Sequence, residues 1–278
     1  MLGGNQPAPG CEALKDPLIE KQERGFVIHY DVLGLTYWML ARIEEIGRTD
    51  LDSHERFPAS SSHAFKCGYL DRPVVDEWLQ VPGQVMQRQW PTVQFVEHRL
   101  NMKVSHDFDN PSLYGFKSWR LILRGMAGDV LRRRNLKHLA LAPWVRLNTK
   151  DQLHPRDPAN TFDWIMDVSE AHGLTSSFYF ICGRTVPQLD ANYDPEHPAI
   201  RALMRRIHQR GHEIGLHPSY GTYRSPDLLK EEADRLRRIA GEQGIEQAKW
   251  GGACTICVGS TPPPYVRGTK PVWHLTVR

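Results

Sequence analysis

The feature that most constrains the fold is an alternation of strand and helix patterns that begins near residue 102. Segments suited to strands occur at Met102–His106, Leu174–Cys182, His212–His217 and, weakly, near Gln247. Amphipathic segments typical of helices lie between and after them, at 117–134, 160–172, 198–209 and 226–240. Strands that are separated by helices pair in parallel. The sequence therefore predicts a parallel α/β sheet or barrel.

Helix boundaries are marked by residues that accept hydrogen bonds from the first backbone N–H groups of a helix, or that end the helical conformation. Asn160 is the expected N-cap of its helix, and Gly173 the expected stop. Pro198 suits a first helical turn, and Ser225 followed by Pro226 forms a cap and first-turn pair. These signals fix the expected helix ends within a few residues.

The region before residue 99 lacks this alternation. Residues 1–25 are rich in Gly, Pro and charge and predict a poorly ordered N-terminal segment. Asp31–Ile46 predicts an amphipathic helix, with Leu35, Trp38 and Ile43 on one stripe. We therefore expect a small α+β N-terminal module over 26–98, a partial barrel over 99–252, and a separate tail over 253–278.

Composition limits the classes of partner. No run approaches the ~18 apolar residues of a membrane span, and the N-terminus lacks a secretory signal. A net charge of +3 is too mild to argue for an anionic-membrane partner, and it disfavours a nucleic-acid role. The basic cluster of Arg132–Arg134 with Arg124 and Lys137 is expected to be a solvated helix face rather than a phosphate-binding patch.

Cysteine usage indicates a compartment. The five cysteines are odd in number and scattered, which is atypical of a disulfide framework. A reducing cytoplasm is therefore the expected location.

Two carboxylates follow the first barrel strand. Side chains on an extended segment alternate, so Asp107 and Asp109 are expected on the same side. Catalytic groups of α/β barrels sit at the C-terminal ends of strands. One carboxylate can bind a metal while the other accepts a proton from water. The alternative is an ordinary turn or helix cap after a strand.

A histidine ends a later strand. His217 lies within the segment 211–219, GHEIGLHPS, and is the last residue of the expected strand. It is therefore expected at the same rim as the carboxylates. His212 faces the opposite side of that strand by alternation, so the two are not expected to share a metal. A structural histidine at a strand end is the alternative.

Taken together, the two motifs resemble the polysaccharide deacetylase, or NodB-homology, family. Residues 26–250 carry the resemblance, which also includes NTFDWIMDVSEAHGLTSSFYFI at 160–181. It implies a distorted (β/α) barrel and a metal-dependent hydrolase that removes acyl groups from N-acylated sugars or sugar precursors. It also implies that Asp107 is the catalytic base and that Asp109 and His217 are metal ligands.

The resemblance leaves the metal site incomplete. Many family members place a second ligand His four residues after the first, where this chain has Gly221. Zinc, the candidate divalent metal, ordinarily takes three protein ligands and an open position. His212, His106 or a later residue could supply the third ligand, or metal binding could be weak or absent.

The C-terminal tail departs from the family pattern. Its Cys254 and Cys257 form a C-x-x-C without the second pair or helix start that a zinc or redox site needs. The coding sequence can be read in a shifted frame, in which each codon begins with the last base of the preceding one. In that frame residues 253–258 can encode RMHYLR and residues 268–276 can encode WNEAGLAFD. Both strings resemble family motifs. A frameshift near Gly252 is therefore expected. A barrel truncated there should also expose the sheet face that carries Phe178 and Phe180.

Three functions follow as hypotheses. The first is a metal-dependent carbohydrate deacetylase, inactive in this truncated form. The second is a pseudoenzyme or sugar-binding module that lacks turnover. The third is a non-functional fragment of a disrupted gene.

Overall fold

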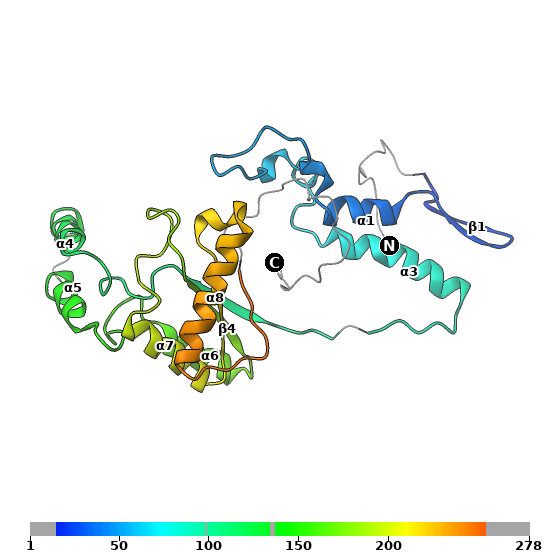
Figure 1. Cartoon of the computed structure of the whole chain (residues 1–278). Helices are drawn as coiled ribbons and strands as arrows, with labels where there is room; N and C mark the ends of the chain where they lie inside the picture. The colour runs from blue at the N-terminus through cyan, green and yellow to red at the C-terminus, as the bar shows by residue number, and fades with distance from the viewer. Residues whose placement is uncertain (1–14, 98, 134–136, 254–278) are drawn as a thin grey trace. The chain divides into compact units, whose positions relative to one another are not determined.

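A computed structural model describes residues 15–97, 99–133 and 137–253, and within these nothing is stated for the side chains of 128–133, 137, 138 and 224. The described residues form two compact units, one ending at Arg99 and the other beginning at Leu100 (Figure 1). None of the described helices is long and apolar enough to cross a membrane.

The first unit combines a hairpin with helices. Strands β1 (Ile19–Gln22) and β2 (Gly25–Ile28) pair antiparallel, so the expected poorly ordered segment contains a strand. The helices are α1 (Val32–Leu40), η1 (Ile43–Glu45), η2 (Ala59–Ser61), α2 (His63–Lys66) and α3 (Val74–Gln89). The helix expected over 31–46 ends early because Arg42 adopts a left-handed conformation, with φ of 54°. A small core of Ala64, Tyr69 and Val74 packs against neighbouring side chains.

The second unit is built on a parallel sheet. Strands β3 (Val104–Phe108), β4 (Ser176–Ile181) and β5 (Glu213–His217) lie in sequence order. Its helices are α4 (Trp119–Arg133), α5 (Lys137–Asn148), α6 (Phe162–Ala171), α7 (Pro198–Gln209), η3 (Tyr220–Arg224) and α8 (Pro226–Glu242). The predicted mixed α/β class with a parallel sheet is confirmed, and the described residues form no closed barrel. The weak strand near Gln247 is represented by one parallel bridge, Leu216 with Gly252.

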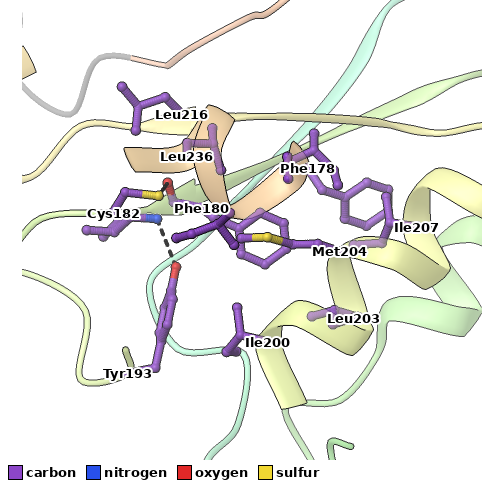
Figure 2. Close-up of a cluster of buried hydrophobic side chains, with 14 of the residues drawn as sticks. Phe178, Phe180, Cys182, Tyr193, Ile200, Leu203, Met204, Ile207, Leu216 and Leu236 are labelled. Carbon is purple, nitrogen blue, oxygen red and sulfur yellow. Dashed lines mark hydrogen bonds between the residues drawn. The ribbon is translucent and has the colours of Figure 1, made fainter. Parts of the chain in front are cut away.

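The main core lies between one face of this sheet and three helices. Phe178 and Phe180 of β4 are fully buried and pack with apolar residues of α6, α7 and α8 (Figure 2). The expectation that these two rings would lose cover is therefore wrong, because they point toward the helices. The opposite face carries Ser105, Asp107 and Glu213, which are exposed.

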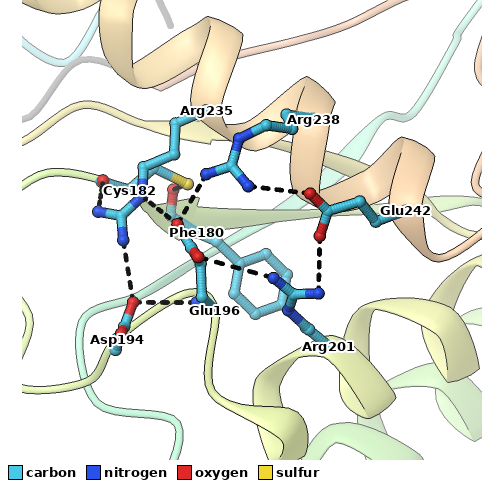
Figure 3. A network of polar contacts seen from close by, with 8 residues as sticks. All are labelled: Phe180, Cys182, Asp194, Glu196, Arg201, Arg235, Arg238 and Glu242. Atoms are coloured by element: carbon cyan, nitrogen blue, oxygen red, sulfur yellow. Dashed lines mark hydrogen bonds and ion pairs between the residues drawn. The ribbon is translucent and has the colours of Figure 1, made fainter.

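Ion pairs fix α8 over the end of β4. Arg235 donates to the carbonyl of Cys182 at 2.8 Å and to Glu196 at 3.1 Å (Figure 3). Arg238 donates to Glu196 at 2.7 Å. The hydrogen bonds from Arg238 and Arg235 hold the pKa of Glu196 below its ordinary value. The loop between β4 and α7 is thereby attached to α8.

Candidate functional site

The two carboxylates lie at the C-terminal edge of the sheet. Asp107 is exposed on β3, where it pairs in register with Tyr179 on the sheet face opposite the helices. Asp109 follows the strand directly, and its side chain is 61% exposed. The structure thus places both predicted carboxylates at the rim where parallel α/β proteins position their chemistry.

His217 reaches the same rim from β5. It is the last residue of that strand and is 5% exposed. Its Nδ1 lies 3.3 Å from the carbonyl oxygen of Pro218. Because a carbonyl oxygen only accepts, Nδ1 is the donor in this contact, which leaves Nε2 as the ring atom that faces the rim.

The Nε2 atom of His217 faces a carboxylate. The Nε2 atom of His217 lies 3.7 Å from Oδ1 of Asp109. Two ligand atoms that are each ~2.1 Å from a tetrahedral metal are separated by about 3.4 Å. A proton or a cation between the two atoms would stabilise the pair, and an imidazole nitrogen and a carboxylate oxygen at this spacing are donor types that a metal ion takes.

A third ligand is not found among the described residues. Their His, Cys, Asp and Glu side chains form no group of three that could hold a metal. His106 belongs to the helix-covered face, where its ring contacts Phe178 and burial lowers its pKa. His212 precedes His217 by five residues, or roughly 16 Å along a strand at about 3.3 Å per residue. Neither histidine can complete the pair.

Gly221, where the resemblance would place a second histidine, has little space for a side chain. A Cβ on Gly221 would lie 2.9 Å from Cβ of Thr185, closer than side chains pack. The N–H of Gly221 donates to Oγ1 of Thr185 at 2.7 Å. A side chain at this position would have to displace Thr185.

Tyr193 is a structural residue of the site that the sequence analysis missed. Its hydroxyl accepts from the N–H of Ile181 at 2.8 Å (Figure 2). It also donates to the carbonyl of Phe108 at 3.5 Å. It therefore joins the ends of β3 and β4 through Phe108, the residue between Asp107 and Asp109. Burial raises its pKa well above the ordinary value, so it stays a neutral donor. A tyrosine in a loop carries no local signal for this role.

Glu232 of α8 holds the loop that follows His217. It accepts from the N–H of Ser219 at 2.9 Å and from the Ser219 hydroxyl. Ser219 in turn lies 3.0 Å from Oγ1 of Thr185. Burial raises the pKa of Glu232 although both hydrogen bonds favour its charged form. This buried carboxylate also lacked a sequence signal, because α8 is otherwise a charged amphipathic helix.

The structure describes two of the five cysteines. Cys67 is partly buried and Cys182 is buried, and both are free thiols. Cys11, Cys254 and Cys257 lie outside the described residues, as does the tail from residue 254.

Comparison with known proteins assigns only the N-terminal region. A family of unknown function (DUF7033) matches residues 6–91. No curated protein and no solved structure matches the chain. The matched region ends before Asp107, so it carries no information about the candidate site.

Proposed function

We propose that the second unit is part of a (β/α) barrel of the polysaccharide deacetylase type. The strand order β3-β4-β5 follows the sequence, and α6, α7 and α8 contribute to one core on one face. A doubly wound sheet instead reverses its strand order and is covered by helices on both faces. One-sided helices over sequential parallel strands are what a barrel segment requires.

The proposed activity is metal-dependent removal of acyl groups from N-acylated sugars. The pairing of Asp109 with His217 at 3.7 Å is the observation that carries it. A bound divalent ion such as zinc would polarise the acyl carbonyl and lower the pKa of water. Asp107 is exposed on the same face as Asp109 and would accept the proton of the attacking water.

A second function is favoured by the two-ligand geometry. A site with Asp109 and His217 alone binds a metal weakly, which suits a pseudoenzyme or sugar-binding module more than a working hydrolase. The proposed partner is a carbohydrate or sugar precursor in either case. The free thiols of Cys67 and Cys182 are consistent with the proposed cytoplasmic location.

The frameshift near Gly252 remains a proposal of its own. If it is correct, the 278-residue chain has no deacetylase activity or is a fragment of a disrupted gene. Sequencing the coding DNA around Gly252 tests it directly, because a single-base change of frame should restore family-like motifs downstream.

Activity is tested by comparing this chain with a frame-restored version on N-acetylated sugar oligomers, with acetate release as the readout. The restored protein should release acetate only with a divalent metal. Asp107→Asn should bind the metal and lose turnover, since it removes a base rather than a ligand. Undiminished turnover in Asp107→Asn would refute the assigned roles.

A further inference from the structure

Charge is strongly segregated along this chain. The segment 119–148, which spans α4 and α5, contains seven Lys and Arg residues and a single acidic residue, Asp129. The rest of the chain then holds 28 basic and 31 acidic residues. The modest net charge of +3 therefore conceals a basic segment within an acidic remainder.

Helix α4 exposes apolar and basic side chains together. Its buried residue Ile122 is 2% exposed, whereas Trp119 is 43% and Leu123 is 60% exposed. Trp119 and Leu123 are four residues apart and so share one face of the helix. Arg120 and Arg124, also four apart and exposed, form the adjoining stripe.

Helix α5 also exposes large apolar side chains. Val145 is fully buried, whereas Trp144 and Leu147 are 56% and 57% exposed and lie three residues apart on one face. Figure 1 shows α4 and α5 beside each other, and the two helices contact one another. We call Trp119, Arg120, Leu123, Arg124, Trp144 and Leu147 the α4–α5 surface.

We propose that the α4–α5 surface docks on an anionic lipid bilayer. Helices that lie in the membrane interface combine exposed Trp and Leu with Lys and Arg. Tryptophan favours the depth of the lipid headgroups, and each cation near an anionic leaflet adds attraction that falls off within a Debye length. A nucleic acid would use the cations but not the exposed leucines. A solvated helix face can also expose a single large apolar side chain, as α6 does at Trp164, but there the neighbours are the acidic Asp163 and Asp167 rather than arginines. The inference does not depend on the proposed hydrolase function.

The test is flotation of the full 278-residue chain with lipid vesicles, in which aggregated protein sinks and bound protein rises. The chain should float with vesicles of phosphatidylcholine and phosphatidylglycerol, but not with phosphatidylcholine alone. Raising salt to 1 M should weaken flotation, because the Debye length falls to about 3 Å. Trp144→Ala with Leu147→Ala, and separately Arg120→Glu with Arg124→Glu, should each weaken binding roughly tenfold or more.

Matched controls separate the surface from bulk properties. Trp164→Ala removes a tryptophan that is 67% exposed on α6, beside the acidic Asp163 and Asp167, and should leave flotation unchanged. Lys230→Glu with Lys249→Glu changes the net charge as much as the arginine pair and should also have little effect. Circular dichroism confirms that each variant is folded.

Three results would overturn the proposal. The first is failure of the wild-type chain to float with anionic vesicles. The second is equal loss in the control and test variants. The third is binding to an oligonucleotide that Arg120→Glu with Arg124→Glu removes, without any binding to vesicles.

Discussion

The side-chain amide of Gln247 pairs with the backbone of Ile214. Its Oε1 accepts from the Ile214 N–H at 2.7 Å, and its Nε2 donates to the Ile214 carbonyl at 2.8 Å. One side chain thus makes the two hydrogen bonds that a neighbouring strand would make. It occupies the edge of β5 just before the backbone itself pairs through Gly251 and Ala253 with Leu216.

Replacing Gln247 should reveal this pairing. Gln247→Leu leaves both backbone groups of Ile214 without their partner and should lower the free energy of unfolding by about 1–3 kcal/mol. Gln247→Glu should be equally harmful at neutral pH, since a carboxylate would face the carbonyl, and should recover below about pH 4 as it protonates. Urea denaturation measures both, with exposed Glu246→Ala as the control. If the stability of Gln247→Glu relative to wild type is the same at pH 7 and pH 3.5, the pairing is contradicted.

Gly215 should not tolerate a side chain. A Cβ there would lie 2.4 Å from the Tyr179 ring and 2.7 Å from the carbonyl oxygen of Gly251. Because that oxygen belongs to the backbone that pairs with β5, we expect Gly215→Ala to lower the free energy of unfolding by about 1–3 kcal/mol. Gly241→Ala, on α8 with no atom within 4 Å of its Cβ, should be neutral or stabilising by up to about 1 kcal/mol. Similar melting temperatures for the two variants would disprove the close contact.

Glu232 should make stability depend on pH in a defined direction. Its pKa is raised above the ordinary 4.5, mainly by burial. The folded state therefore holds the proton more tightly, and this contribution to stability is lost as pH rises through the raised pKa. The Glu232→Gln variant lacks this titrating carboxyl, and its amide can still form hydrogen bonds with Ser219. Its stability relative to wild type should therefore increase from pH 4.5 toward neutral pH.

Glu232→Ala serves as the comparison for that variant. It leaves the buried N–H of Ser219 without an acceptor and should be about 1–3 kcal/mol less stable than Glu232→Gln at any pH, because neither variant carries the titrating carboxyl. Denaturant unfolding at pH 5 and pH 8 separates the two cases. A Gln variant that loses as much stability as the Ala variant at pH 8 would show that the carboxylate is needed in its charged form.

Local patterns predicted the framework of the second unit well. Ser225 does cap α8, accepting from the N–H of Leu228 at 3.4 Å, and α7 spans Pro198–Gln209 as expected. The cap of α6 differs, because Asn160 donates to the carbonyl of His154 and Thr161 takes the cap position. Helices α3 and α5 were missed because each contains an internal proline, Pro82 and Pro143, which ordinarily ends a helix.

Contacts between residues that are distant in the sequence could not be predicted from local patterns. Alternation along β5 correctly separated His212 from His217, but it could not show that Thr185 closes the space beside Gly221. Phe178 and Phe180 were assigned to the wrong face, because period-two alternation does not say which face the helices cover. Tyr193 and Glu232 each form hydrogen bonds to a segment distant in the sequence, and no short sequence motif predicts such bonds.

The paired cysteines of the tail should be dispensable. If residues 253–278 are read in a shifted frame, Cys254→Ser with Cys257→Ser should leave the melting temperature and the metal content of the chain unchanged. Differential scanning calorimetry and elemental analysis provide the two readouts. A fall of several degrees or a loss of bound zinc would establish the C-x-x-C as a real site.

The central claim is that Asp109 and His217 are two ligands of one metal ion, and calorimetric titration with Zn²⁺ tests it most directly. The Cys254→Ser, Cys257→Ser chain is the right background, because thiolates would otherwise bind zinc. We expect one ion per chain, with binding at least about tenfold weaker in Asp109→Ala and in His217→Ala, as expected when one of only two ligands is lost. Binding should be unchanged in the control His208→Ala on α7. Unchanged stoichiometry and affinity in both ligand variants would contradict the account.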